Sequence, residues 1–115
     1  MTLIFKICDS GEWAAARSEG VYNGSAHDRR DGFIHFSTAA QLPGTLAKHY
    51  EHRDGLLLIA FETNDLGEAL KWEPARDGDL FPHLHARLRT SAALWVQRLP
   101  LDEDGLHILP PEVQA

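Results

Sequence analysis

The sequence has a single cysteine, Cys8, and no apolar run long enough to cross a bilayer. One thiol cannot close an internal disulfide, and without a second cysteine there is no thiolate metal site. The N-terminal apolar residues have no basic leader and are interrupted at Lys6, far short of a signal segment. We therefore expect a protein of the reducing cytoplasm that is neither exported nor inserted in a membrane.

The sequence also has few basic residues. It contains 11 Lys and Arg against 17 Asp and Glu, which gives a formal net charge of −6. Attraction to DNA, RNA or anionic lipid requires clustered Lys and Arg, so bulk nucleic-acid binding is not expected. The 115 residues, 43% of them hydrophobic and 24% charged, suit one folded domain over residues 1–115 with a sizeable core. The composition does not indicate an oligomeric state.

Hydrophobic periodicity predicts an α+β fold, with a curved, mainly antiparallel sheet and two short helices. Segment 56–61 is apolar on both faces, which is typical of a central strand covered from both sides. In segment 3–8 alternation places Lys6 and Cys8 on one face. The expected strands are 3–8, 33–37, 56–61, 69–73 and 94–99, with a short extra strand at 105–109 and a frayed tail from 110.

The first helix is expected at residues 10–18. Asp9 is placed to cap it and Gly20 to end it. The segment 22–32 that follows is rich in Asn, Gly, Ser, Asp and Arg, so we expect a surface loop there.

The second helix is expected at residues 39–50. Thr38-x-x-Gln41 matches a capping box in front of it. Proline is costly beyond the first turn, so Pro43 indicates that this helix kinks or begins near residue 43.

Segment 33–37 delivers polar side chains to the start of this second helix. Its alternation puts His35 beside Ser37 on one face. A serine next to an imidazole suggests a nucleophile and its base, and a helix start can bind an anion. The structural alternatives are helix capping by Ser37 and Thr38, and a core position for His35.

Segment 81–89 alternates as well and, if extended, aligns His83, His85, Arg87 and Arg89 on one side. This basic stripe in an acidic protein suits a phosphate or carboxylate, so an anionic, nucleotide-like small molecule is the expected partner. The alternative interpretation is a solvated edge strand.

Two further chemistries follow from isolated residues. His83-x-His85 with His35 would make a His-ligated metal enzyme, but no carboxylate lies at a telling distance and we expect no metal. Cys8 shares a face with Lys6 just before a helix, which favours a reactive thiolate. A small buried hydrophobe is the preferred interpretation of Cys8.

Five strings together resemble a bacterial family of small proteins numbered 952 among domains of unknown function. The match extends over nearly the whole chain and is most specific in Gly-Phe-Ile-His-x-Ser-Thr and Phe-Pro-His-Leu. The strings are Ile4-Phe5-Lys6-Ile7, Gly20-Val21-Tyr22, Asp31-Gly32-Phe33-Ile34-His35-Phe36-Ser37-Thr38, Leu70-Lys71-Trp72-Glu73 and Phe81-Pro82-His83-Leu84.

The fold that this resemblance implies is similar to that of the ADP-ribosyltransferase superfamily, a split antiparallel sheet that holds NAD across a cleft. By that analogy Lys6, Ser37 and Thr38 would hold the nicotinamide half of NAD, with Lys6 standing where relatives commonly have His. Glu73 and His83 are the candidates for the third motif position, which is usually Glu.

The resemblance and the patterns give one set of expected site residues. The leading hypothesis is an ADP-ribosyltransferase-like enzyme or ligand-binding protein that takes NAD or a similar nucleotide. A non-catalytic module that binds a small anion or a protein is the alternative from another class. The expected catalytic residues are His35, Ser37 and His83, and the expected cofactor-binding residues are Lys6, Thr38, Tyr22 and Glu73.

Overall fold

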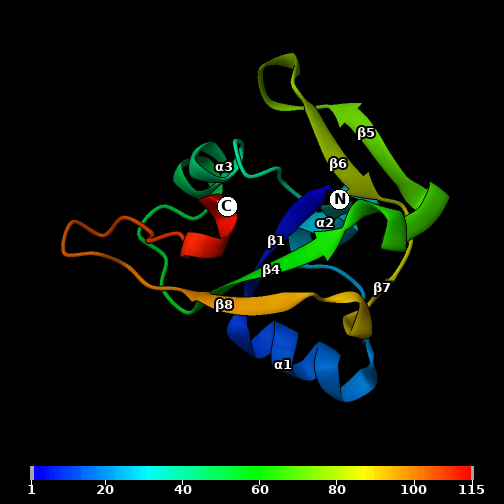
Figure 1. Cartoon of the computed structure of the whole chain (residues 1–115), viewed down its shortest axis with the longest axis horizontal. Helices are drawn as coiled ribbons and strands as arrows, with labels where there is room; N and C mark the ends of the chain where they lie inside the picture. Colours follow the sequence, from blue (N-terminus) through cyan, green and yellow to red (C-terminus); the bar gives the residue numbers. More distant parts are fainter. Residues whose placement is uncertain (1, 115) are drawn as a thin grey trace.

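The computed structural model describes residues 2–114, whose strands all pair antiparallel (Figure 1). Two three-stranded sheets and one two-stranded sheet are formed. The first sheet has the order β1 (Leu3–Asp9), β4 (Leu56–Glu62) and β8 (Trp95–Leu99). The second has the order β3 (Ile34–His35), β6 (Leu80–Leu84) and β5 (Leu70–Pro74), and β2 (Val21–Tyr22) pairs with β7 (Leu88–Arg89).

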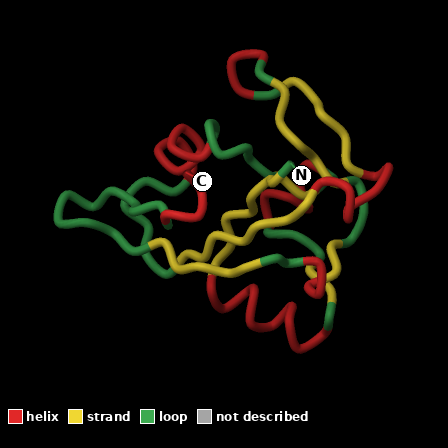
Figure 2. Tube along the Cα trace, in the orientation of Figure 1, coloured by secondary structure: helices red, strands yellow, loops and turns green. Residues whose placement is uncertain are grey.

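Within residues 2–114, three α-helices and several short 3-10 helices lie around these sheets, and Figure 2 draws both kinds in red. None of the helices within the described residues has the length and apolar character needed to span a bilayer. The α-helices are α1 (Ser10–Glu19), α2 (Ala26–Asp31) and α3 (Leu42–His49), and short 3-10 helices occupy Thr63–Ala69, Arg76–Gly78, Thr90–Ala92 and Pro111–Gln114.

Strand β4 is the centre of the core, as its two apolar faces predict. Ile59 and Phe61 are fully buried on one face, in the cluster that includes α1 through Trp13. Leu58 is fully buried on the other face, in the cluster that includes α3 through Leu42. Each face of the β1-β4-β8 sheet is therefore covered by one helix.

The ends of α1 are set by its capping residues, and the start of α3 is set by Pro43. The Asp9 carboxylate accepts hydrogen bonds from two backbone N–H groups of the first turn of α1, and Gly20 ends the helix at φ 81°. Thr38 and Gln41 exchange hydrogen bonds of 3.0 and 3.3 Å before α3, and the helix begins at Leu42, one residue before Pro43. The predicted late start of this helix is confirmed. The Thr38–Gln41 pair closes the turn before α3 instead of capping it, because the N-cap is Gln41, which makes no side-chain capping hydrogen bond.

The two large sheets are joined at one bridge between Phe5 and Ser37. The backbone N–H of each donates to the carbonyl of the other, at 2.8 and 2.9 Å. Strand β3 ends at His35, two residues before the bridge, and is shorter than the expected strand 33–37. The antiparallel sheet is thus split, and the site described below lies beside the bridge.

The expected surface loop at 22–32 is wrong, because α2 lies within it. Ser25 caps this helix through a reciprocal capping box with Asp28, and Gly32 ends it at φ 87°. The helix has only six residues, too few to show a periodic apolar face.

The continuous basic stripe and the solvated edge strand expected for 81–89 are also wrong. Strand β6 ends at Leu84 and lies between β3 and β5. Arg87 and Arg89 line a separate shallow depression beside Gly20.

Two expectations near the C-terminus change as well. The extra strand at 105–109 reduces to an isolated bridge between Leu101 and His107. The tail does not fray at 110, because Pro111–Gln114 forms a 3-10 turn and Val113 is buried against the α3 side of the core.

A Leu58→Ala variant tests the central position of β4. Removing this fully buried side chain should lower the free energy of unfolding by about 2–5 kcal/mol. The matched control is Leu80→Ala, a strand leucine that is 53% exposed, for which a change within about 0.5 kcal/mol is expected. Urea denaturation of both variants gives the comparison, and equal losses would contradict this arrangement of the core.

Candidate functional site

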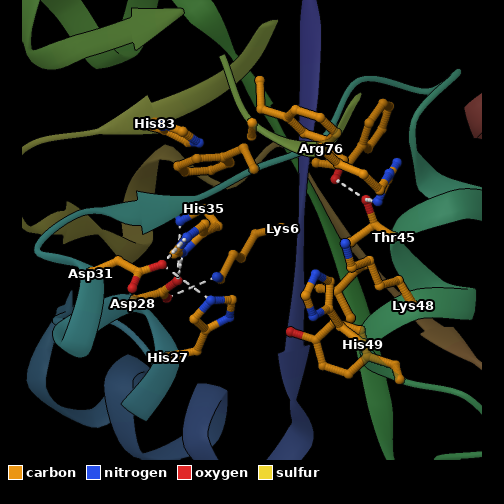
Figure 3. A pocket seen from close by; sticks show the side chains of 17 residues that line it. Lys6, His27, Asp28, Asp31, His35, Thr45, Lys48, His49, Arg76 and His83 are labelled. Atoms are coloured by element: carbon orange, nitrogen blue, oxygen red, sulfur yellow. Dashed lines mark hydrogen bonds and ion pairs between the residues drawn. The ribbon is translucent and has the colours of Figure 1, made fainter. Parts of the chain in front are cut away.

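A pocket of about 230 Å³ opens beside the Phe5–Ser37 bridge. Figure 3 shows its two walls, one from α2 and β3 and the other from α3 and Arg76, with Lys6 of β1 between them. The lining residues are Phe5, Lys6, Ile7, His27, Asp28, Asp31, His35, Phe36, Ser37, Thr45, Lys48, His49, Tyr50, Ala75, Arg76, Phe81 and His83.

A buried ion pair between Lys6 and Asp28 forms the floor of this pocket. The Lys6 Nζ lies 2.8 Å from Asp28 Oδ2, and the two side chains are only 3% and 2% exposed. Burial of two opposite charges requires that each keeps its partner, because an unpaired buried charge is very costly. Strand β1 and helix α2 are held together by this contact.

Asp28 also receives three hydrogen bonds besides the one from Lys6. Its Oδ2 accepts from the Ser25 backbone N–H, and its Oδ1 accepts from the His35 backbone N–H and from His35 Nδ1 at 2.6 Å. Burial raises the pKa of Asp28, but the hydrogen bond from His35 and the Lys6 charge lower it more, so the net pKa is below its ordinary value. The ionised Asp28 therefore adds stability at neutral pH that is lost as the pH falls below the usual range of an aspartate.

Asp31 gathers two imidazoles on the same wall. Its Oδ2 lies 3.0 Å from His35 Nε2 and 3.1 Å from His27 Nε2. Helix α2 places His27 and Asp31 four residues apart on one face, and the rings of His27 and His35 stack at 4.3 Å. One carboxylate and two imidazoles thus face the pocket together.

The opposite wall carries positive charge. A row of hydrogen bonds runs from Ser37 Oγ to Thr45 Oγ1 at 3.0 Å and on to Arg76 Nη1 at 3.4 Å, and the guanidinium lies over the Phe81 ring. Lys48 lines the same wall. Neither Lys48 nor Arg76 forms an ion pair with a carboxylate in the part of the chain that the structure describes.

Burial and the positive charge of this wall lower the pKa of His49, and the Arg76 side chain packs against Gly44. Burial lowers the pKa of His49, and the nearby His27, Lys48 and Arg76 charges lower it further. The Arg76 guanidinium packs so closely on α3 that a Cβ added to Gly44 would lie 2.8 Å from its Nη2 atom. A glycine at this point of the helix therefore leaves room for the guanidinium.

His83 reaches the pocket from β6. Its Nδ1 lies 2.9 Å from Glu73 Oε1, which His85 Nε2 also approaches at 2.8 Å, and its ring stacks on Phe33 at 4.1 Å. Burial lowers the pKa of His83, while the Glu73 carboxylate raises it by a smaller amount. Hydrogen bonds from His85 and His83 lower the pKa of Glu73.

Four of the predicted site residues meet in the pocket: Lys6, His35, Ser37 and His83. The other three, Thr38, Tyr22 and Glu73, are not among its lining residues. Thr38 bonds to Gln41, and Glu73 lies behind His83. Tyr22 is buried against Trp13, and Lys6 Nζ lies 5.9 Å from the centre of its ring.

The metal set considered from the sequence, His35 with His83 and His85, does not come together. Among residues 2–114 the group whose ligand atoms all lie within 4.8 Å of one another is His27, Asp31 and His35. The absence of a nearby carboxylate was therefore a wrong expectation, since Asp31 faces His35 directly.

Sequence reasoning missed Asp28 and most of the other charged residues of the pocket. The Ser25-x-x-Asp28 pattern followed by Gly32 is the signal of a capped short helix, and it would have placed His27 and Asp31 on one face. No comparable signal marks Arg76, which reaches the pocket from the turn between β5 and β6.

Cys8 is not part of this pocket. Its side chain is 3% exposed in the cluster beneath α1, on the same side of β1 as Ile4. Burial raises the pKa of the thiol to about 11. This agrees with the preferred interpretation of Cys8 as a small buried hydrophobe.

Comparisons with known proteins agree with the fold. Residues 7–96 match the model of a family described as "Protein of unknown function (DUF952)". The crystal structure of protein CC0527 from Caulobacter crescentus is 43% identical, covers 99% of this chain and 100% of its own, and superposes with a TM-score of 0.94. The solution structure of CC0527 is 46% identical over 92% of this chain and 91% of its own, with a TM-score of 0.83. The comparison with curated proteins gives no match.

A Lys6→Met variant tests the buried ion pair. It keeps a long side chain but leaves the buried Asp28 without its cation, so the free energy of unfolding should fall by about 3–5 kcal/mol. Lys71→Met, on an exposed position of β5, is the control. Denaturation of the two variants at neutral pH provides the measurement, and a loss at Lys6 no larger than that at Lys71 would refute the pair's role.

The raised pKa of Cys8 predicts slow modification of the native protein. A thiol with a pKa of about 11 is almost entirely protonated at neutral pH, and the thiolate is the reactive species. Labelling by a thiol reagent should therefore be slow in buffer, faster with rising pH, and immediate in denaturant. Rapid labelling of native protein at neutral pH would show that Cys8 is activated.

Proposed function

The chain belongs to the DUF952 family of proteins of unknown function, and we propose that its pocket binds a small anionic molecule of the nucleotide kind, with NAD and ADP-ribose as the leading ligands. The observation that carries this proposal is the pair of cations on the α3 wall. Lys48 and Arg76 both line the pocket, and an Arg fork beside a Lys suits a phosphate or diphosphate.

The charge balance of the pocket supports an anion. Three fixed cations, Lys6, Lys48 and Arg76, line it together with two carboxylates, Asp28 and Asp31. Lys6 is neutralised by Asp28 at 2.8 Å. Lys48 and Arg76 therefore act on the side of the pocket away from both carboxylates, where their field attracts an anionic group.

The size of the pocket limits how much of the ligand is enclosed. A volume of about 230 Å³ is smaller than the roughly 300–1,000 Å³ of most small-molecule pockets. It encloses a phosphate with part of a sugar, or a nicotinamide ring, and leaves the rest of a dinucleotide outside. Binding of NAD would therefore use one end of the molecule.

An ADP-ribosyltransferase-like reaction is the finer form of the proposal. His35, Ser37 and His83 line the pocket and would position the ribose–nicotinamide bond, with catalysis coming from positioning and charge stabilisation. Lys6 would act chiefly by holding Asp28 in place, because its charge is paired with that carboxylate at 2.8 Å. Thr38, Tyr22 and Glu73 do not line the pocket, so they would influence the ligand only through the residues that do.

The alternative form of the proposal is a protein that binds the ligand without converting it. The ion pair between Lys6 and Asp28 favours this alternative. A ligand that entered would find the charge of Lys6 already paired with Asp28 at 2.8 Å. Incubation with NAD, followed by chromatography for nicotinamide, separates the two forms. Release of nicotinamide supports the enzyme, and bound but intact NAD supports the module.

Calorimetric titration with ADP-ribose and NAD in the presence of EDTA tests the binding itself. Arg76→Gln should weaken the affinity by roughly tenfold to a hundredfold, as expected for the loss of a charge-assisted hydrogen bond. Arg17→Gln, an exposed arginine of the last turn of α1, should bind as wild type. No heat with either ligand at about 1 mM would contradict the proposal.

Gly44→Ala is a second probe of the same wall that leaves every charge in place. The new methyl group would meet the Arg76 guanidinium at 2.8 Å and displace it, while alanine favours the helix. Affinity should fall severalfold with no loss of thermal stability. Unchanged affinity in both Arg76→Gln and Gly44→Ala would show that Arg76 does not hold the ligand.

A further inference from the structure

The α2 wall offers a second ligand chemistry, which differs from that of the positive wall. His27 Nε2, Asp31 Oδ2 and His35 Nε2 converge from one face of α2 and from β3. We propose that these three atoms bind a divalent transition-metal ion of the zinc class, with the remaining coordination position open to the pocket. Two imidazoles and one carboxylate form a donor set that suits such an ion.

The spacing of the donor atoms is close to that of a zinc site. Metal–nitrogen and metal–oxygen bonds of about 2.0–2.2 Å in a tetrahedron place neighbouring ligand atoms roughly 3.3–3.6 Å apart. Asp31 Oδ2 lies 3.1 Å from His27 Nε2 and 3.0 Å from His35 Nε2. The two imidazole nitrogens lie within 4.8 Å of each other, and binding of the ion would draw them closer together.

The hydrogen bond between Asp28 and His35 prepares the imidazole as a ligand. The Asp28 carboxylate, which pairs with Lys6 Nζ at 2.8 Å, lies 2.6 Å from His35 Nδ1 and accepts its proton in a hydrogen bond. This hydrogen bond leaves Nε2, which faces Asp31, as the ring nitrogen that would bind the ion. Such a carboxylate behind a ligating histidine fixes the tautomer and the ring direction in metal sites.

The rest of the set is free to adjust. His27 is 38% exposed, and its ring stacks on that of His35 with an interplanar angle of 27°. A rotation of His27 about its side-chain bonds turns the two lone pairs toward one point. The Asp28 that supports His35 is fixed from the other side by Lys6 and Ser25.

Titration of EDTA-treated, dialysed protein with Zn²⁺ alone tests this site, with calorimetry for stoichiometry and thermal unfolding for linkage. Wild type should bind one ion and unfold at a higher temperature in its presence. His27→Ala and Asp31→Asn should each weaken binding more than the roughly 10–100-fold typical of second-shell changes.

His85→Ala is the matched control, because His85 is 37% exposed and bonded to a carboxylate much as His27 is. It should bind Zn²⁺ as wild type does. Absence of Zn²⁺ binding by wild type would overturn the proposal, as would equal affinity in His27→Ala. Loss of binding in His85→Ala alone would assign the ion to Glu73 and its histidines instead. Binding of ADP-ribose in EDTA is measured separately, so the two proposals fail independently.

Discussion

The buried Lys6–Asp28 ion pair is the constraint on which the rest of the site depends. Strand β1 and the short helix α2 are 22 residues apart in sequence, and this contact joins them at 2.8 Å with both side chains out of solvent. Helix α2 is too short to be stable alone, so its capping residue Ser25, the ion pair and the His35 hydrogen bonds hold it in place. Every position on the α2 wall follows from that anchoring.

The same pair separates the charges of the pocket. Because Asp28 is paired with Lys6 and hydrogen-bonded to His35, it does not neutralise Lys48 or Arg76 on the opposite wall. Asp31 remains with the two imidazoles. Although the protein has a formal net charge of −6, the pocket wall with Lys48 and Arg76 is locally positive. Inside a pocket the effective dielectric constant is lower than in water, so each contact between these cations and an anion is stronger.

Local patterns predicted the elements whose cause is local. The two apolar faces of 56–61 identified the central strand, and Asp9, Gly20 and Pro43 marked helix ends that the structure confirms. Alternation also brought His35 and Ser37 to one pocket. The short helix α2 was missed because six residues show no period, and Arg76 because its approach depends on how β5 and β6 turn over α3. Long-range charge pairing, such as that of Lys6 with Asp28, has no signature in spacing.

The two walls also make the two proposed ligands interdependent. A divalent ion on His27, Asp31 and His35 would cancel the Asp31 charge and add a positive one, on the wall that faces Lys48 and Arg76. An anion between the walls would then meet positive charge on both sides, and by linkage would tighten the metal by the same factor as the metal tightens the anion. The Lys6–Asp28 pair is what allows this coupling, because a mobile Asp28 would neutralise whichever cation it reached first and leave no field for a ligand.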